Sequence, residues 1–219
     1  MIQEQLGLLR TEIPRTVTLI AVSKTKPVSD IAIAYAAGQR HFGENKVQEM
    51  VEKAAQLPSD IKWHLIGHLQ TNKVKYMAGF VHLIHGVDSL KLLEEINKQA
   101  AKVARIQDVL LQFHIAQEET KFGLNLSEAQ DLLSSNAYEQ LQHIRICGVM
   151  GMASFTSDQK QISQEFENLV QIFNQLQEDF FKNHDQFTEI SMGMSGDYQL
   201  AISKGSTMVR VGSKIFGGR

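Results

Sequence analysis

The sequence VTLIAVSKTKPVSDIAIAYAA at residues 17–37 joins an apolar, β-branched run to a segment with helical periodicity. The first six residues suit a buried strand, and residues 29–37 place their apolar positions on one face of a helix. Lys24 follows the run by two positions, after Val22. The segment therefore predicts a strand, a short connection and an amphipathic helix.

The same unit recurs along the chain. Short apolar runs occur at residues 17–22, 40–42, 63–66, 81–87, 109–115, 144–150, 187–192 and 208–211. Helical patterns lie between them at residues 29–37, 46–55, 89–103, 127–134 and 159–181. Alternating strands and helices predict a parallel sheet with helical crossovers. Eight units favour the α/β class as a single (β/α)8 TIM barrel over residues 1–219, with a doubly wound open sheet as the alternative.

Composition excludes several classes of protein. The chain has 219 residues, of which 43% are hydrophobic, and its 22 basic and 24 acidic side chains nearly cancel. The sequence has no stripe of basic residues of the kind that binds nucleic acid, and no segment has the length of a membrane span. Cys147 is the single cysteine, inside an apolar run, which favours a core role and a reducing, cytoplasmic location. We expect neither nucleic acid nor a membrane as a partner.

Lys24 is the first candidate for chemistry. A period of two places it on the same side of the strand as Ile20 and Val22, at the strand's carboxyl end. In a barrel this end carries the functional groups. A lysine there is either a catalytic or Schiff-base amine or a solvated charge at the rim.

Two C-terminal segments favour an anion site. SMGMSGD at residues 191–197 ends a strand in small and hydroxyl residues, and Ser195 is a candidate N-cap for a helix at residues 198–203. Free N–H groups at such a turn suit a phosphate, although an ordinary glycine turn is the alternative. In GSTMVRVGS at residues 205–213, Arg210 points into the barrel if Val209 and Val211 face the helices. A buried guanidinium needs an anion, a carboxylate or a heteroaromatic acceptor, with a structural salt bridge as the alternative.

Histidine pairs also suggest a metal. His64 and His68, and His82 and His85, have spacings that zinc sites use. The first pair crosses from a strand into a loop, and strand parity separates the second pair. The sequence therefore favours core or rim histidines and no metal site.

Five segments together closely resemble the YggS/PROSC family of pyridoxal 5′-phosphate (PLP) binding proteins. They are AVSKTKP at residues 21–27, FGENKVQE at 42–49, WHLIGHLQTNK at 63–73, SMGMS at 191–195 and GSTMVRVG at 205–212. The resemblance spans nearly the whole chain. The chain departs from the family at two positions, where the family often has proline in place of His68 and serine in place of Thr71.

The resemblance implies a barrel like the N-terminal domain of bacterial alanine racemase, with PLP held as an aldimine on Lys24. By the same motifs, Ser195, Thr207, Gly212 and Ser213 surround the phosphate and Arg210 faces the pyridine nitrogen. Asn45 and His64 are expected near the ring. Ser191 and Met194 complete the expected set of cofactor-binding residues.

Three functions are open. The first is a non-catalytic role in intracellular PLP (vitamin B6) homeostasis, with indirect effects on amino-acid and keto-acid balance. The second is a low-activity racemase- or lyase-like PLP enzyme acting on amino acids, and the third is a PLP-gated regulatory protein. Racemisation needs an acid–base group on each face of the cofactor, and Lys24 supplies one. Alanine racemase takes the other from a second domain, which we do not expect here. We therefore expect a monomeric carrier that passes PLP to apo-enzymes.

Overall fold

The strands close into a parallel barrel. The computed structural model describes residues 1–118 and 122–218. Within them, neighbouring strands pair in chain order and the last strand pairs with the first, all in parallel. The strands are β1 (Thr18–Val22), β2 (His41–Glu44), β3 (Lys62–Leu65), β4 (Leu83–Val87), β5 (Gln107–Phe113), β6 (Ile144–Gly151), β7 (Glu189–Met194) and β8 (Met208–Val211). The predicted barrel is confirmed, and the open sheet is not formed.

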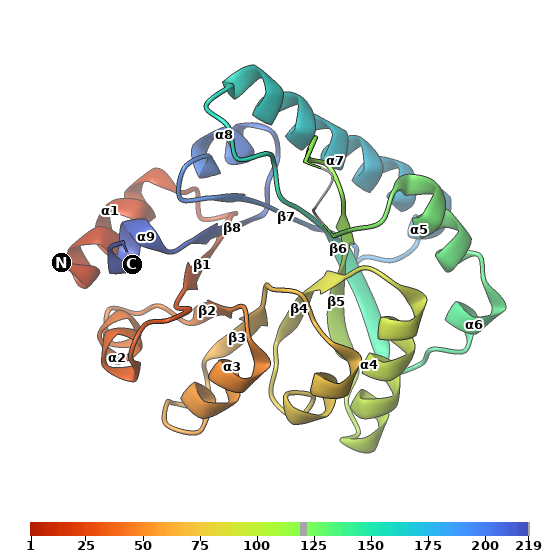
Figure 1. Cartoon of the computed structure of the whole chain (residues 1–219), viewed down its shortest axis with the longest axis horizontal. Helices are drawn as coiled ribbons and strands as arrows, with labels where there is room; N and C mark the ends of the chain where they lie inside the picture. Colours follow the sequence, from red (N-terminus) through yellow and green to blue (C-terminus); the bar gives the residue numbers. More distant parts are fainter. Residues whose placement is uncertain (119–121, 219) are drawn as a thin grey trace.

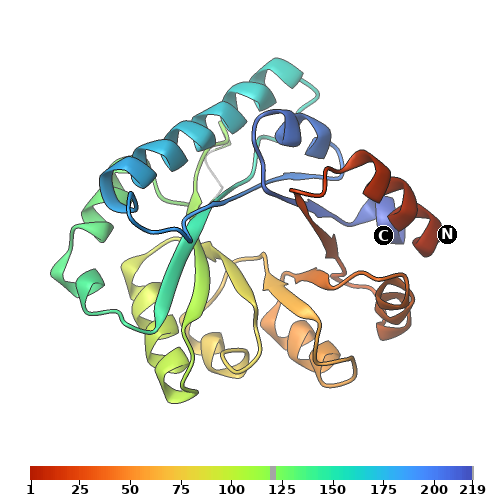
Figure 2. The ribbon, with the colours of Figure 1, turned by 180° about the vertical axis from the view of Figure 1, so that it is seen from behind.

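Helices surround this barrel on its outer side (Figure 1), and the reverse view shows the same ring (Figure 2). They are α1 (Ile2–Glu12), α2 (Val28–Ala36), α3 (Val47–Ala54), the 3-10 helix η1 (Thr71–Tyr76), α4 (Leu90–Lys102), α5 (Leu126–Leu133), α6 (Asn136–Glu139), α7 (Gln159–Phe180), α8 (Tyr198–Ser203) and α9 (Ser213–Phe216). Both figures show the two chain ends side by side, at α1 and α9. Among the described helices, none combines the length and apolar character needed to cross a membrane.

The core has two parts, set by the alternation of side chains along the strands. The larger part fills the space between barrel and helices, where Val209, Val211 and Phe166 are buried. A smaller part fills the barrel interior and includes Ile20, Leu110, Cys147, Met150 and Met208. Because Ile20 faces inward, Val22 and Lys24 follow on the inner side, as the period-two prediction requires.

All eight carboxyl ends lie at one end of the barrel because every strand pair is parallel. The register of β7 shifts against β8 between Ser191 and Met194. Gly193 lies in this irregular segment with φ of 95°, and a Cβ there would come within 2.5 Å of the Ala201 side chain. Glycine is therefore needed at position 193 for α8 to pack closely on the end of β7.

Candidate functional site

A cavity of about 800 Å³ occupies the carboxyl end of the barrel. Its volume suits a drug-sized or cofactor-sized ligand. Most of the residues predicted for the site contribute to its wall, namely Lys24, Asn45, Met194, Ser195, Arg210, Gly212 and Ser213. The structure thus brings together residues that are up to 189 positions apart in sequence, between Lys24 and Ser213.

The segment that carries Lys24 is anchored from below by buried polar groups. The Ser23 hydroxyl donates to Glu44 Oε1 at 2.5 Å, and Lys53 Nζ donates to the Ser23 carbonyl oxygen at 2.7 Å. Thr25, one residue after Lys24, has a φ of 65°, and its N–H donates to Glu49 Oε1 at 2.6 Å. These bonds hold both chain neighbours of Lys24, so they fix the position from which its side chain enters the cavity.

Glu44 and Lys53 form a buried ion pair in this support. Lys53 Nζ lies 2.8 Å from Glu44 Oε1 and 2.7 Å from Glu49 Oε1. Glu44 is 0% exposed, and its second oxygen, Oε2, is buried without a hydrogen-bond partner. Burial raises the pKa of Glu44, while the hydrogen bonds from Lys53 and Ser23 lower it. The Glu44 carboxylate therefore depends on Lys53 for its charged form.

The ends of β7 and β8 meet through a side chain. The Gly212 N–H donates to Ser195 Oγ at 3.1 Å. The predicted N-cap role of Ser195 is wrong, because α8 begins after Asp197, whose Oδ1 accepts a hydrogen bond from the Met194 N–H. The additional residues between strand and helix leave the Ser195 hydroxyl at the cavity wall. The Ser195 hydroxyl and the Gly212 N–H therefore lie together at the cavity wall, beside Ser213.

Arg210 points into the barrel, as predicted, and is 4% exposed. Its Nη1 donates to the Ser191 carbonyl oxygen at 2.9 Å and to Ser191 Oγ at 2.6 Å, and Nη2 donates to the Gly151 carbonyl oxygen at 3.1 Å. Burial lowers the pKa of Arg210 to about 10, and the charge of Asp197 opposes that shift. The guanidinium remains charged at neutral pH and is held by three bonds to uncharged oxygen atoms.

A chain of hydrogen bonds continues from Arg210 through the barrel interior. Ser191 Oγ lies 2.9 Å from His85 Nδ1, His85 Nε2 lies 2.9 Å from His64 Nδ1, and His64 Nε2 lies 2.9 Å from His41 Nδ1. Burial lowers the pKa of His64 and His85 well below the usual value, so both imidazoles are neutral. Ser191 Oγ has two lone pairs, so it can accept from both Arg210 Nη1 and His85 Nδ1, and the direction of the bonds between the imidazoles depends on their tautomers. This chain of hydrogen bonds holds the Arg210 side chain in place inside the barrel.

Three predicted site residues lie elsewhere. Thr207 precedes β8 and therefore lies at the opposite end of the barrel, about 16 Å along the strand from Gly212. Its hydroxyl donates to Glu189 Oε2 at 2.6 Å, so the predicted phosphate contact is wrong. Ser191 and His64 are 0% exposed within the barrel and do not line the cavity. Ser191 contacts Arg210, and His64 follows it in the hydrogen-bond chain, so both lie behind the cavity wall; their direct contact with a ligand stays a prediction.

The histidine pairs do not form the arrangements considered from sequence. His68 lies at the cavity rim, where its ring stacks on Phe122 with centroids 4.5 Å apart. His82 and His85 both lie beside the His64 ring, at centroid distances of 5.3 and 5.1 Å. The expectation that strand parity separates these two is wrong, because His82 precedes the first residue of β4 and is not bound by its alternation.

The cavity offers chemistry suited to an aldehyde that carries an anionic group and an aromatic nitrogen. A primary amine, from Lys24, is available for covalent attachment. Hydroxyl and N–H donors at Ser195, Gly212 and Ser213 suit phosphate oxygens. The Arg210 guanidinium suits an aromatic nitrogen that accepts a hydrogen bond.

Known proteins share this sequence and fold. The family model "Alanine racemase, N-terminal domain" matches residues 1–219. The pyridoxal phosphate homeostasis protein of Pasteurella multocida is 40% identical over 206 residues, which cover 93% of this chain and 87% of that protein. Its counterpart in Aquifex aeolicus is 37% identical, with 92% and 86% covered.

Solved structures agree. PipY of Synechococcus elongatus, solved with PLP bound, is 38% identical and superposes with a TM-score of 0.89 over 99% of this chain and 100% of that chain. Alanine racemase of Bacillus anthracis, at 14% identity and a TM-score of 0.74, shares the fold over 56% of its own length. The barrel, its order of strands and the extent of these matches lead to one assignment. The chain belongs to the family of pyridoxal phosphate homeostasis proteins, which have the fold of the alanine racemase N-terminal domain.

Proposed function

We propose that this chain binds PLP covalently through Lys24 and takes part in PLP homeostasis as a carrier without catalytic activity of its own. The observation that carries the proposal is the convergence of Lys24, Arg210 and the Ser195–Gly212 contact on one cavity. PipY, which shares 38% of its sequence with this chain over its full length, has been solved with PLP bound. The relatives named above supply the role in homeostasis.

The residues present fit the cofactor. Its phosphate would accept hydrogen bonds from Ser195, Ser213 and the Gly212 N–H, in place of the present bond between Ser195 and Gly212. Its ring would lie between Lys24 and Arg210, with Asn45 and Met194 in the same wall. When bound, PLP supplies a reactive aldehyde and an electron-withdrawing ring. The protein's own residues hold these groups in place.

Arg210 is one argument against efficient catalysis, although racemases tolerate the same arrangement and it does not decide the question alone. A guanidinium has only donors, so it leaves the pyridine nitrogen unprotonated and weakens the ring as an electron sink. A second lysine in the wall, Lys26, donates to the carbonyl oxygens of Phe216 and Gly218 at 3.1 and 3.0 Å, which occupies its amine. Lys24 is therefore the amine available for attachment. The two lysines do not provide efficient proton transfer on both faces of the cofactor.

The rim supports exchange of the cofactor with its surroundings. Phe155, Phe122 and Met194 line the cavity and remain 98%, 58% and 37% exposed, respectively. Water and incoming amines therefore reach the mouth of the barrel. We infer that apo PLP-enzymes are the recipients and that the carrier works as a monomer in the cytoplasm.

Transfer to an apo-enzyme tests this function. The holo-protein is mixed with an apo PLP-enzyme, and recovery of that enzyme's activity is followed against an equal amount of free PLP. We expect recovery with the wild type and none with Lys24→Ala protein treated in the same way and freed of unbound PLP. Failure to donate to several acceptors, together with stereospecific exchange of an amino acid's α-proton in deuterated water, would establish the racemase- or lyase-like alternative instead.

A further inference from the structure

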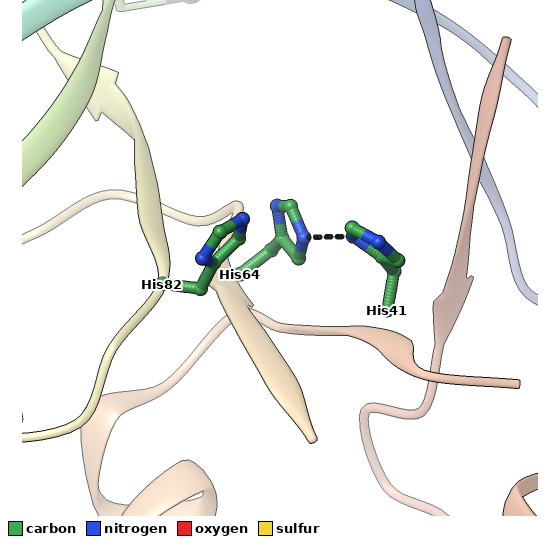
Figure 3. Close-up of side chains that lie close together, drawn as sticks. All are labelled: His41, His64 and His82. Carbon is green, nitrogen blue, oxygen red and sulfur yellow. Dashed lines mark hydrogen bonds between the residues drawn. The ribbon is translucent and has the colours of Figure 1, made fainter. Parts of the chain in front are cut away.

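Three histidines meet at the end of the barrel opposite the cavity. His41 is the first residue of β2, His64 lies in β3, and His82 directly precedes β4. One ligand atom from each lies within 4.8 Å of the other two. Figure 3 shows the three rings turned toward one another from three neighbouring segments of the barrel. We propose that His41, His64 and His82 bind one divalent transition-metal ion, with Zn²⁺ as the representative ion.

The distances require little rearrangement. Zinc bonds imidazole nitrogen at about 2.0–2.1 Å, so tetrahedral ligands lie about 3.3–3.4 Å from each other. His41 Nδ1 and His64 Nε2 are already 2.9 Å apart, and the proton between them must move to the second nitrogen of its own ring when both atoms bind the ion. The His82 ring must approach by up to about 1.4 Å to join them. His82 is half-buried at the start of a strand, and within the described residues its ring makes no hydrogen bond that would have to be broken.

The surroundings match those of metal-binding imidazoles. Ligating histidines usually hydrogen-bond a partner through their second nitrogen, which fixes the ring. His64 does so through Nδ1, 2.9 Å from His85 Nε2. His41 and His82 are both half-buried, and a neutral imidazole presents a lone pair to a metal ion. Three imidazoles and an open position, filled by water on the half-exposed side, form a recurring zinc arrangement.

Charged neighbours act in both directions. Lys62 lies close enough to disfavour positive charge on all three histidines, and Arg105 adds to this at His82. Asp108 acts oppositely at His82. The exposed Lys62 ammonium is screened by water and salt. Because all three proposed ligands are imidazole nitrogens, we expect the site to select metals that favour nitrogen over those, such as Mg²⁺ and Ca²⁺, that favour oxygen ligands.

Titration of the chelator-treated full chain with Zn²⁺, in competition with a chromophoric chelator, tests the site. We expect one ion per chain, with or without PLP, and no competition by Mg²⁺. His41→Ala and His82→Ala each remove a half-buried ligand. Loss of a residue that only hydrogen-bonds a ligand typically weakens metal binding about 10–100-fold, and we expect these two variants to lose more. His184→Ala, at an exposed position, is the matched control and should bind as the wild type does.

Circular dichroism establishes that each variant is folded. Should either variant be unfolded, the wild type is instead followed by NMR, where Zn²⁺ must shift the ring nitrogens of His41, His64 and His82 and leave those of His184 unchanged. Absence of stoichiometric binding to the wild type overturns the proposal. So does retained affinity in either alanine variant, or an equal loss in His184→Ala.

Discussion

Lys53→Met removes the cation that supports the Lys24 segment. Methionine approximates the length of the lysine stem, so the change deletes charge with little loss of volume. Lys53 currently donates to Ser23, Glu44 and Glu49 at 2.7–2.8 Å. Glu49 is partly exposed, so water can solvate its carboxylate once Lys53 is gone. The Lys53–Glu49 ion pair therefore contributes about 0–1 kcal/mol to stability. Glu44, 0% exposed, cannot rehydrate.

The cost is dominated by Glu44. Removal of one partner of a buried pair destabilises a protein by about 3–5 kcal/mol, and we expect a loss of unfolding free energy in that range at neutral pH. Burial already raises the pKa of Glu44 above its ordinary value of 4.5, and loss of Lys53 raises it further. Between the ordinary and the raised pKa the unfolded chain releases the proton while the native state keeps it. Stability of the variant therefore falls as pH rises through this window, and its deficit is smallest in acid.

Urea unfolding at several pH values, followed by far-ultraviolet circular dichroism, measures this effect. Glu44→Gln/Lys53→Met is the paired control, because it removes both charges, and should recover part of the loss. A deficit below about 1 kcal/mol at neutral pH, or one that grows as pH falls, would refute the assignment of Glu44 as a buried carboxylate held by Lys53.

Three further outcomes follow from the positions of Arg210, Thr207 and Cys147. Arg210→Gln should weaken PLP retention by about 10–100-fold while the barrel stays folded, as measured by equilibrium dialysis and circular dichroism; unfolding with unchanged affinity per folded molecule would make Arg210 structural. Thr207→Val should lower unfolding free energy by about 1–3 kcal/mol through loss of its bond to Glu189 and leave PLP affinity and transfer unchanged, since an effect on transfer would place it at the phosphate. Burial raises the pKa of Cys147 to about 12, so iodoacetamide at pH 8 should label it in denaturant and spare it in the native protein, by mass spectrometry.

Local pattern was sufficient for the fold and for the two residues on which the proposed function depends. Strand parity placed Lys24 at the mouth of the barrel and Arg210 inside it, because alternation is a property of the backbone. The same reasoning failed at Thr207 and Ser195. Hydroxyl and glycine residues flank β8 on both sides, and only the position of the strand's ends decides which of them reach the cavity.

Other features depend on contacts between distant segments. The sequence favours solvent for Lys53 and Glu44, since charged residues are rarely buried, and no local signal shows that they meet under Ser23. The sequence carries no sign of the contact between His41 and His64, because the two residues come from different strands. The helical patterns in the sequence begin at residue 29, so they do not predict α1 at Ile2–Glu12.

The covalent attachment of PLP to Lys24 is the central claim, and borohydride reduction tests it most directly. Reduction makes a lysine–PLP link permanent, and peptide mapping by mass spectrometry then locates the modified residue. We predict modification of Lys24 in the wild type and its loss in Lys24→Ala, with Lys26 unmodified because its amine is bound to backbone carbonyl oxygens. Label found mainly on Lys26 or Lys204 would contradict it.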